Sequence, residues 1–420
     1  MAKTVKFAAL AALAGLVLAA CGGSSSDAKN LIIATDLPLQ GSAFDANDST
    51  NKAIQLYLEQ IDEDPNTDGV QFSGYTLTLK PYDNATAAKG SWDDAQCKKN
   101  AADHVANADE IAVMGTYNSG CAKLIVPVLN ADPNGPMLMV SDANTNPGLT
   151  KPWDQGEPDI YYPTGARNYA RVVTTDDFQG AAAAQFMKQD LGVTKCYVLN
   201  DNETYGQGVA KAFVGEASAQ GIEIVGDEAW SKDAPDYTSL FNKVKATGAD
   251  CVYIAGIFDN NGGKLVNDKV AVLGDNTKVK LMGPDGFTGY PDLTANPNAE
   301  GMYLTFAGLS SDLLLANGGK AADFLNAYKA KYGVDPVGSY PLYGVAAVQV
   351  ILEAIKLSDG TRKGVTDAVF STGISIPADV SILGKAMNID KATGDVDVRD
   401  ITVELVTGGA ETTLKAWPVG

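Results

Sequence analysis

The sequence is poor in the residue types that most often bind metals or act as nucleophiles. Among 420 residues there are five cysteines and a single histidine, His104. No two cysteines lie close together, whereas zinc sites usually draw their ligands from closely spaced pairs. The G-x-S-x-G motif of nucleophilic serines is missing, and His104 lies in the polar helical stretch "AADHVANADE", which predicts a solvent-exposed side chain. These absences weigh against an enzyme, and we expect neither a metal site nor a cofactor.

Basic residues are also scarce relative to acidic ones. The chain has 32 Lys and Arg against 51 Asp and Glu, a formal net charge of −19. A surface of that sign repels nucleic acid and anionic membranes, so we expect no nucleic-acid partner. After the first 20 residues, no apolar run is long enough to span a bilayer. The remaining sequence therefore predicts globular domains rather than membrane-spanning helices.

One acidic segment, "DPNTDG" at residues 64–69, matches the first half of a calcium-binding loop. The loop has a glutamate at its twelfth position, where this chain has Tyr75. Both an acidic turn and a cation site stay open for this segment.

The N-terminus has the pattern of an export signal. Two lysines precede an uncharged run at residues 7–20, and small residues stand directly before Cys21. This pattern resembles the lipobox of bacterial lipoproteins. The resemblance implies that residues 1–20 are a signal peptide and that Cys21 is lipidated, with residues 21–29 as a flexible tether. The mature chain is then extracytoplasmic and lipid-anchored to a bacterial membrane.

If Cys21 carries lipid, four cysteines remain, an even number that suits disulfides in an oxidising compartment. Sequence alone permits three pairings of Cys97, Cys121, Cys196 and Cys251. Cys196 begins the run "CYVLND" and Cys251 begins "CVYIAG", so the two occupy the same place in two strand-like segments. We predict that these two pair on adjacent strands, which leaves Cys97 to pair with Cys121.

Strand-like and helix-like segments alternate along the chain. Apolar runs such as "NLIIATD", "EIAVMG" and "PMLMVS" are separated by helical patterns, and the alternation restarts after residue 170 with "CYVLND" and "CVYIAG". Near-continuous apolar strands joined by helices predict parallel sheets covered on both faces, here one sheet for each of two lobes. Further helical patterns follow the second set of strands, and packing against the first lobe is one way to bury them.

Four segments, "GTYNSGCAKLIVPVLN", "SDANTNPGLT", "NDNETYGQGVA" and "MGPDGFTG", resemble the periplasmic branched-chain amino acid-binding proteins of bacterial importers in order and spacing. The resemblance implies a type I periplasmic-binding fold, an α/β fold of two lobes joined by three hinge crossings, near residues 162–170, 305–308 and 389–396. It places residues 30–168 and 308–392 in lobe 1, and residues 169–307 and 393–420 in lobe 2.

The same segments supply candidate ligand-binding residues at strand ends, where helix N–H groups point outward and favour anions. Ser119 follows "EIAVMG" and precedes a helix, so its hydroxyl and amide can hold a carboxylate. By resemblance, the Ala143 backbone and Thr145 face the head group of an amino acid, and Tyr205 closes over it from the second lobe. Asp285 occupies the family's acidic position, where a carboxylate meets the ligand ammonium.

Several of these positions depart from the family. A longer glutamate is common where Asp285 stands, and a tyrosine is common where Ile257 stands. Tyr117 and Asn118 occupy positions that usually carry smaller or more apolar side chains. Because all four residues belong to the pocket lining, leucine, isoleucine and valine are only default ligands.

The resemblance implies a monomeric solute receptor that delivers a small amino acid to the permease subunits of an ABC importer. A sensory subunit on the same fold is an alternative, because function depends on the site and its partner surface. A receptor for a small amide or an organic acid is another alternative.

Overall fold

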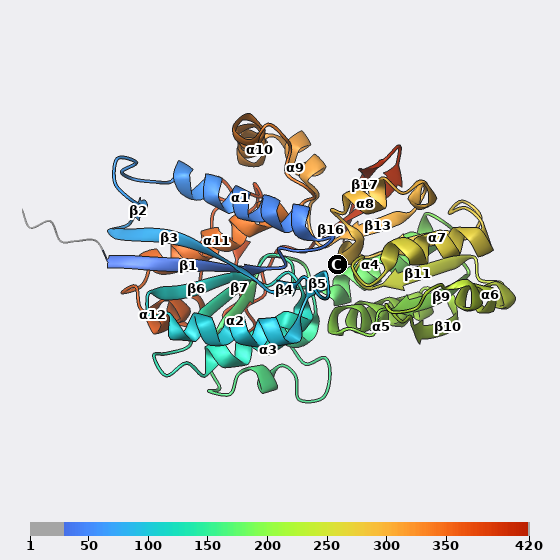
Figure 1. Cartoon of the computed structure of the whole chain (residues 1–420), viewed down its shortest axis with the longest axis horizontal. Coiled ribbons are helices and arrows are strands. Elements are labelled where there is room, and N and C mark those ends of the chain that lie inside the picture. Colours follow the sequence, from blue (N-terminus) through green and yellow to red (C-terminus); the bar gives the residue numbers. More distant parts are fainter. Residues whose placement is uncertain (1–28, 419–420) are drawn as a thin grey trace, which may run out of the picture.

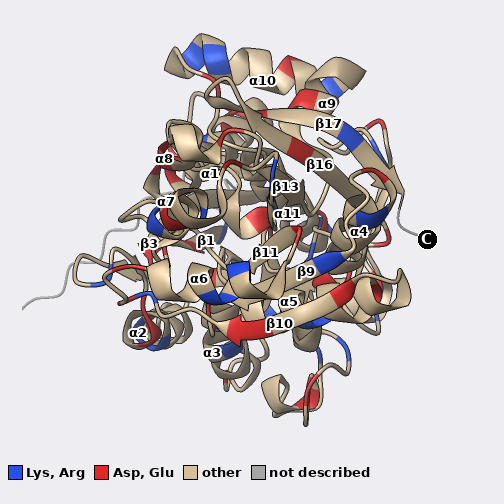
Figure 2. Cartoon of the chain, turned by 90° about the vertical axis from the view of Figure 1, so that its right-hand side faces the viewer, with Lys and Arg blue, Asp and Glu red and all other residues tan. Residues whose placement is uncertain are grey.

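The structure, a computed structural model, describes residues 29–418 as two α/β lobes that lie side by side (Figure 1). The predicted lipidation site Cys21, the signal peptide and residues 21–28 of the tether lie outside the described residues. The alternation of strands and helices predicted from the sequence is confirmed in both lobes. Lys and Arg are scattered over separate helices and strands and are interspersed with Asp and Glu (Figure 2).

The first lobe is built on a six-stranded sheet in the order β2-β3-β1-β6-β7-β8. All neighbouring pairs are parallel except β2 with β3. Every residue of β6 is buried, as expected for a strand that is covered by helices on both faces. The strands are β1 (Lys29–Leu37), β2 (Val70–Phe72), β3 (Tyr75–Asp83), β6 (Glu110–Gly115), β7 (Leu138–Ser141) and β8 (Tyr169–Arg171).

The helices of the first lobe come from two separate parts of the chain. The N-terminal part supplies α1 (Phe44–Gln60), α2 (Asp94–Ala106) and α3 (Ser119–Asn130). The returning part supplies α9 (Ser311–Asn317), α10 (Gly319–Tyr332), α11 (Tyr340–Lys356) and α12 (Arg362–Asp367). Most of α11 is buried in the core of this lobe, against α1 (Figure 1). Two short hairpins complete the lobe: β4 (Ala85–Thr86) with β5 (Ser91–Trp92), and β14 (Ser375–Ile376) with β15 (Met387–Asn388).

The second lobe has a seven-stranded sheet in the order β10-β9-β11-β12-β13-β16-β17. The first five strands are parallel, and the hairpin β16–β17 adds two antiparallel strands from the C-terminal part of the chain. Gly408 and Gly409 make the hairpin turn, with φ of 60° and 82°, values that favour glycine. The strands are β9 (Lys195–Asn200), β10 (Glu223–Ala229), β11 (Cys251–Ala255), β12 (Lys280–Gly283), β13 (Tyr303–Phe306), β16 (Asp400–Thr407) and β17 (Ala410–Pro418). The helices are α4 (Asp176–Gln189), α5 (Thr204–Ala219), α6 (Thr238–Thr247), α7 (Gly262–Leu273) and α8 (Pro291–Thr294).

The chain passes between the two sheets after β8, after β13 and before β16. The crossing after β13 lies where the sequence places it. The other two lie a few residues later, because β8 at residues 169–171 still belongs to the first sheet and residues 389 and 396 pair with each other as an isolated bridge.

Both predicted disulfides are present. Cys196 and Cys251 lie directly opposite each other on the parallel strands β9 and β11, with their Cα atoms 4.6 Å apart. The disulfide between Cys97 and Cys121 joins α2 to α3, with a Cα–Cα distance of 5.7 Å. The equal positions of the two cysteines in their apolar runs therefore identified neighbouring strands correctly.

The prediction that His104 is exposed is wrong, because its side chain is wholly buried. The imidazole Nε2 lies 3.0 Å from Asp36 Oδ2, and Nδ1 contacts the carboxylate of Glu110. Burial lowers the pKa of His104, but the hydrogen bonds to the two carboxylates outweigh it and raise the pKa to about 9. Asp36 is far from His104 in the sequence, so the polar residues around the histidine gave no sign of this partner.

Candidate ligand-binding site

A small cavity lies between the two lobes, at the ends of strands from both sheets. Its volume is about 20 Å³, little more than one water molecule needs. A molecule with several non-hydrogen atoms does not fit in this volume. Seven of the eight ligand-binding residues predicted from the sequence line this cavity, namely Tyr117, Asn118, Ser119, Ala143, Tyr205, Ile257 and Asp285, and Gly286 and Tyr340 complete the lining.

Thr145 is the predicted residue that does not line the cavity. Its side chain is wholly buried, and its hydroxyl favours the ionised form of the nearby Asp176 carboxyl group. Its carbonyl oxygen accepts a hydrogen bond of 2.9 Å from the backbone N–H of Asp176, the first residue of α4. Thr145 therefore connects the first lobe to the start of the second.

The loop from β6 to α3 forms the first-lobe wall. Asn118 precedes α3 without a side-chain capping bond, and the first turn has no acidic residue. The loop is held in place by Asn144, whose Nδ2 donates to the carbonyl oxygen of Tyr117 at 3.0 Å. Uncapped N–H groups at a helix start carry partial positive charge, so the end of the cavity beside Ser119 suits a carboxylate.

Asp285 is the acidic centre of the second-lobe wall, in a short turn that follows β12. Its Oδ1 accepts a hydrogen bond of 2.7 Å from Gln179 Nε2 and another from the Tyr205 hydroxyl. Its Oδ2 accepts from the hydroxyl of Tyr340, which belongs to the first lobe. The carboxylate of Asp285 therefore joins the two lobes directly.

Gly286 leaves room for this arrangement. Its backbone N–H donates to the Tyr205 hydroxyl at 3.0 Å, while that hydroxyl donates to Asp285. A Cβ atom at Gly286 would lie 2.4 Å from the carbonyl oxygen of Gly256 and 2.7 Å from the Tyr205 ring. A side chain at this position would displace the tyrosine from the carboxylate.

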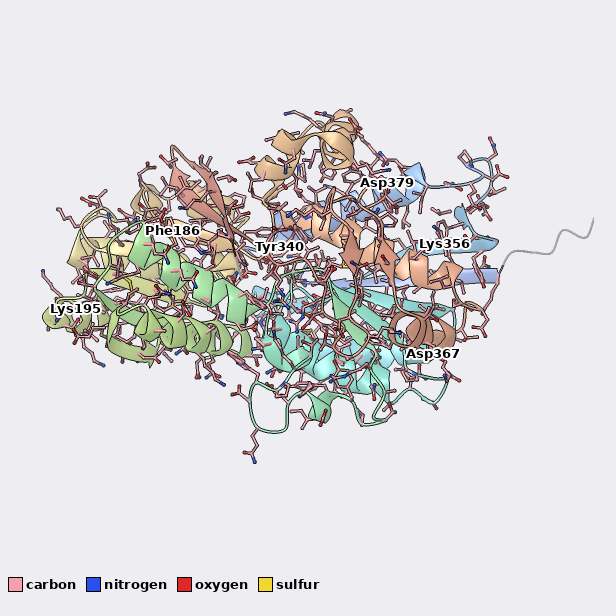
Figure 3. All side chains as sticks on the ribbon, turned by 180° about the vertical axis from the view of Figure 1, so that it is seen from behind. Phe186, Lys195, Tyr340, Lys356, Asp367 and Asp379 are labelled. Carbon is pink, nitrogen blue, oxygen red and sulfur yellow. A yellow bond between two sulfur atoms is a disulfide. The ribbon has the colours of Figure 1, made fainter. Side chains whose placement is uncertain are left out.

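The sequence analysis missed Tyr340 and Gln179, which both contact Asp285. Tyr340 begins the long apolar helix α11 and lies at the junction between the lobes (Figure 3). Its ring packs edge-on against Tyr117, with 5.3 Å between the ring centroids. Neither residue stands at the end of a strand, so the strand-end signal that identified Ser119 and Asp285 could not have found them.

Asp285 lines the cavity, and two further buried carboxyl groups lie close to its lining, Asp176 near Asp285 and Asp142 near Tyr340. Burial raises the pKa of Asp285 to about 6, although the bonds from Tyr205 and Tyr340 oppose this shift. Burial raises the pKa of Asp142 to about 7. Burial, with the nearby Asp285 charge, raises the pKa of Asp176 well above its usual range. A positively charged group that entered the cleft would favour the ionised form of these side chains.

The described part of the chain contains no group of three or more His, Cys, Asp or Glu side chains placed to hold a metal ion. Within residues 29–418, no helix has the length and apolar character needed to cross a membrane.

Comparisons with known proteins agree with this architecture. The family model described as periplasmic binding protein matches residues 33–398. The leucine-, isoleucine-, valine-, threonine- and alanine-binding protein of Pseudomonas aeruginosa is 24% identical over 367 residues, which cover 87% of this chain and 88% of that protein.

Two solved structures share the fold. A leucine-binding protein from Thermotoga maritima superposes with a TM-score of 0.74 at 22% identity, covering 92% of this chain and 98% of that one. A solute-binding protein of an ABC transporter from R. palustris, in complex with benzoate, gives a TM-score of 0.72 at 17% identity, covering 93% and 97%. The chain therefore belongs to the periplasmic binding protein family and is a binding protein rather than an enzyme.

Proposed function

We propose that this protein is the receptor of an ABC importer and binds a small amino acid between its two lobes. The observation that carries the proposal is that one cavity has two walls of opposite electrostatic character. The uncapped start of α3, beside Ser119, is on one wall, and the carboxylate of Asp285 is on the other. The first suits a carboxylate and the second an ammonium group. An α-amino acid carries both groups on one carbon atom.

Tyr117, Asn118 and Ile257 then face the ligand side chain. Burying a leucine-sized side chain contributes about 1.5–3 kcal/mol, whereas an unpaired charge in the head-group site costs about 2–5 kcal/mol. Matching of the head group therefore decides the class of ligand, and the apolar end selects within that class. Branched-chain amino acids remain the first ligands to test, and the Pseudomonas aeruginosa relative is named for binding them.

We also propose that ligand binding is coupled to hinge motion between the two lobes, at the three places where the chain passes from one sheet to the other. Residues from both lobes line the cavity, so a bound ligand makes contacts in the closed form that the open form lacks. Lipidation at Cys21 would keep the receptor near its permease and raise their effective concentration.

An aromatic acid is a second candidate ligand. The tyrosines Tyr117, Tyr205 and Tyr340 line the cavity, and the R. palustris neighbour is described in complex with benzoate. Such a ligand lacks the ammonium group that would pair with Asp285. The same variant therefore distinguishes the two candidates.

The experiment begins with native mass spectrometry of the purified chain to identify the small molecule that it retains. Calorimetry then compares the ligand affinity of the parent with that of Asp285→Asn, which removes the charge and nearly preserves the shape. We expect a loss of about 2–5 kcal/mol of binding, which is about thirty-fold to several thousand-fold in affinity. Ser119→Ala should lose less, because the backbone N–H groups at the start of α3 remain.

Asp292→Asn is the matched control, because Asp292 is an exposed aspartate on α8 of the same lobe. The Asp292→Asn variant should bind the ligand with the same affinity as the parent. If Asp285→Asn also binds as tightly as the parent, the ligand has no ammonium group at that position, and an organic acid or an amide replaces the amino acid.

A further inference from the structure

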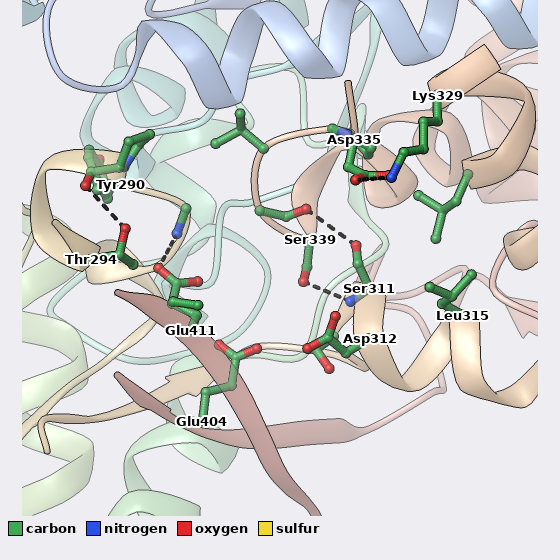
Figure 4. A pocket seen from close by; sticks show the side chains of 18 of the residues that line it. Tyr290, Thr294, Ser311, Asp312, Leu315, Lys329, Asp335, Ser339, Glu404 and Glu411 are labelled. Carbon is green, nitrogen blue, oxygen red and sulfur yellow. Dashed lines mark hydrogen bonds and ion pairs between the residues drawn. The ribbon is translucent and has the colours of Figure 1, made fainter. Parts of the chain in front are cut away.

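A second and much larger cavity lies between the lobes, separate from the cleft around Asp285. Its volume is about 570 Å³, within the range of small-molecule sites. Figure 4 shows its lining. The second lobe contributes α8, the preceding segment from Gly289 and the hairpin β16–β17, and the first lobe contributes α9, α10 and the segment between α10 and α11.

Glu404 is the least expected side chain in this cavity. It lies on β16, is only 5% exposed and leaves Oε2 without a hydrogen-bond partner within residues 29–418. Its carboxyl group points into the cavity toward Asp312 and Glu411 (Figure 4). Burial, followed by the charges of Glu411 and Asp312, raises the pKa of Glu404 well above its usual range. A buried carboxyl group without a partner is costly unless something pairs with it.

Glu411 is oriented toward the same space by a backbone contact. It lies on β17, the strand next to Glu404, and its Oε1 accepts a hydrogen bond of 2.8 Å from the N–H of Gly289. In the hairpin register, Glu404 faces Thr413, two residues from Glu411, so both carboxyl groups project from the same face of the sheet. Two acidic side chains are thus held together on one wall.

The opposite wall adds Asp312, a third carboxyl group that pairs with no basic side chain of the described lining. Asp312 on α9 is exposed at the cavity. The lysine of the lining, Lys329, forms an ion pair of 2.7 Å with Asp335. The three carboxyl groups therefore lack a basic partner from the described part of the lining.

We propose that this cavity binds a small organic cation of the primary amine or guanidine class, whose charged groups pair with Glu404 and Glu411 on one lobe and Asp312 on the other. A single metal ion fits less well, because no three such side chains within residues 29–418 are placed close enough to hold one. The size of the cavity also suits a molecule rather than an ion. Because the carboxyl groups come from both lobes, a bound cation reduces the repulsion that opposes their contact.

The test uses 1,4-diaminobutane as the probe and 1,4-butanediol as its neutral counterpart, titrated calorimetrically into the mature chain at physiological salt. Salt at that level screens long-range attraction to the acidic surface. We expect the diamine to bind and the diol not to bind. Glu404→Gln should weaken diamine binding by at least about tenfold, since it removes a buried charge partner. Asp312→Asn should weaken it by about threefold, as expected for an exposed pair.

Asp379→Asn is the control, because Asp379 is an exposed aspartate of the first lobe outside the cavity (Figure 3). It should bind the diamine as the parent does, and thermal unfolding verifies that each variant is folded. Asp285→Asn separates this proposal from the amino-acid site: diamine binding that persists in this variant supports a second site. The proposal is overturned if the diamine does not bind, if Glu404→Gln binds it unchanged, or if only Asp285→Asn loses it.

Discussion

The first lobe and the region of the cleft both bury charged side chains, but the partners of these side chains differ between the two places. In the first lobe, the imidazole of His104 lies between Asp36 and Glu110, and Arg362 contacts Asp132. Beside the cleft, the wholly buried Asp176 has the Thr145 hydroxyl and the charge of Arg171, itself paired with Asp395, to favour its ionised form. Burial of paired charges stabilises a unique packing only while the pairs stay complete. The comparison predicts that the first cluster stabilises the fold and that the ionised form of Asp176 is costly.

Replacing Arg362 gives the largest expected change in stability. This residue begins α12 in the returning part of the chain, and its guanidinium also donates to the carbonyl oxygens of Glu110 at 2.8 Å and His104 at 3.1 Å. Arg362→Met leaves Asp132 buried without its cation, so the free energy of unfolding should fall by about 3–5 kcal/mol. Urea unfolding measures this change. The neighbouring exposed lysine supplies the control, since Lys363→Met breaks only a surface pair with Asp367 and should cost less than about 1 kcal/mol. Equal effects of the two variants would contradict a structural role for the cluster.

The titration of His104 also tests whether this buried cluster stabilises the fold. Its pKa is raised from 6.5 in the unfolded chain to about 9 in the folded chain. The folded state therefore holds the proton more tightly. The resulting stability, about 3 kcal/mol, is fully present below pH 6.5 and is lost as the pH rises through about 9.

Because His104 is the only histidine, its ring protons can be followed by NMR without assignment in a chain that lacks a histidine tag. We expect a titration midpoint near pH 9 and a parallel loss of stability between pH 7 and pH 9. A midpoint near that of a free histidine would mean that the imidazole does not lie between the two carboxylates.

Asp176→Asn gives the smallest expected effect, and unlike Arg362→Met it should stabilise the protein. Burial raises the pKa of Asp176 in the folded chain, although the Thr145 hydroxyl and the Arg171 charge oppose this shift. Stability is therefore lost as the pH rises and the buried carboxyl group ionises. Asp176→Asn removes that charge, and at pH 8 we expect the free energy of unfolding to rise by about 1–2 kcal/mol. Asp177→Asn, which loses contacts to Lys151 and Thr175, should lower it slightly. Urea unfolding of both variants measures the difference. If Asp176→Asn is less stable than the parent, the Asp176 carboxyl group stabilises the fold.

Much of this fold is predictable from short stretches of sequence. Apolar runs that alternate with helical patterns predict two sheets, and the equal placement of Cys196 and Cys251 in their runs predicts their pairing on neighbouring strands. The positions of Ser119, Tyr205 and Asp285 after strands place them at the cavity, because the ends of parallel strands meet at one edge of a sheet.

Other features depend on contacts between residues that are far apart in the chain. The polar neighbours of His104 suggested exposure, and only the packing of α2 on β1 brings Asp36 to its imidazole. Tyr340 reaches Asp285 because the returning helix α11 completes the first lobe at the cleft. Glu404 resembles any acidic residue on a strand until the hairpin and α9 enclose it. Local sequence patterns determine which face of an element is buried, whereas the partners of a buried charge are decided only when distant elements pack together.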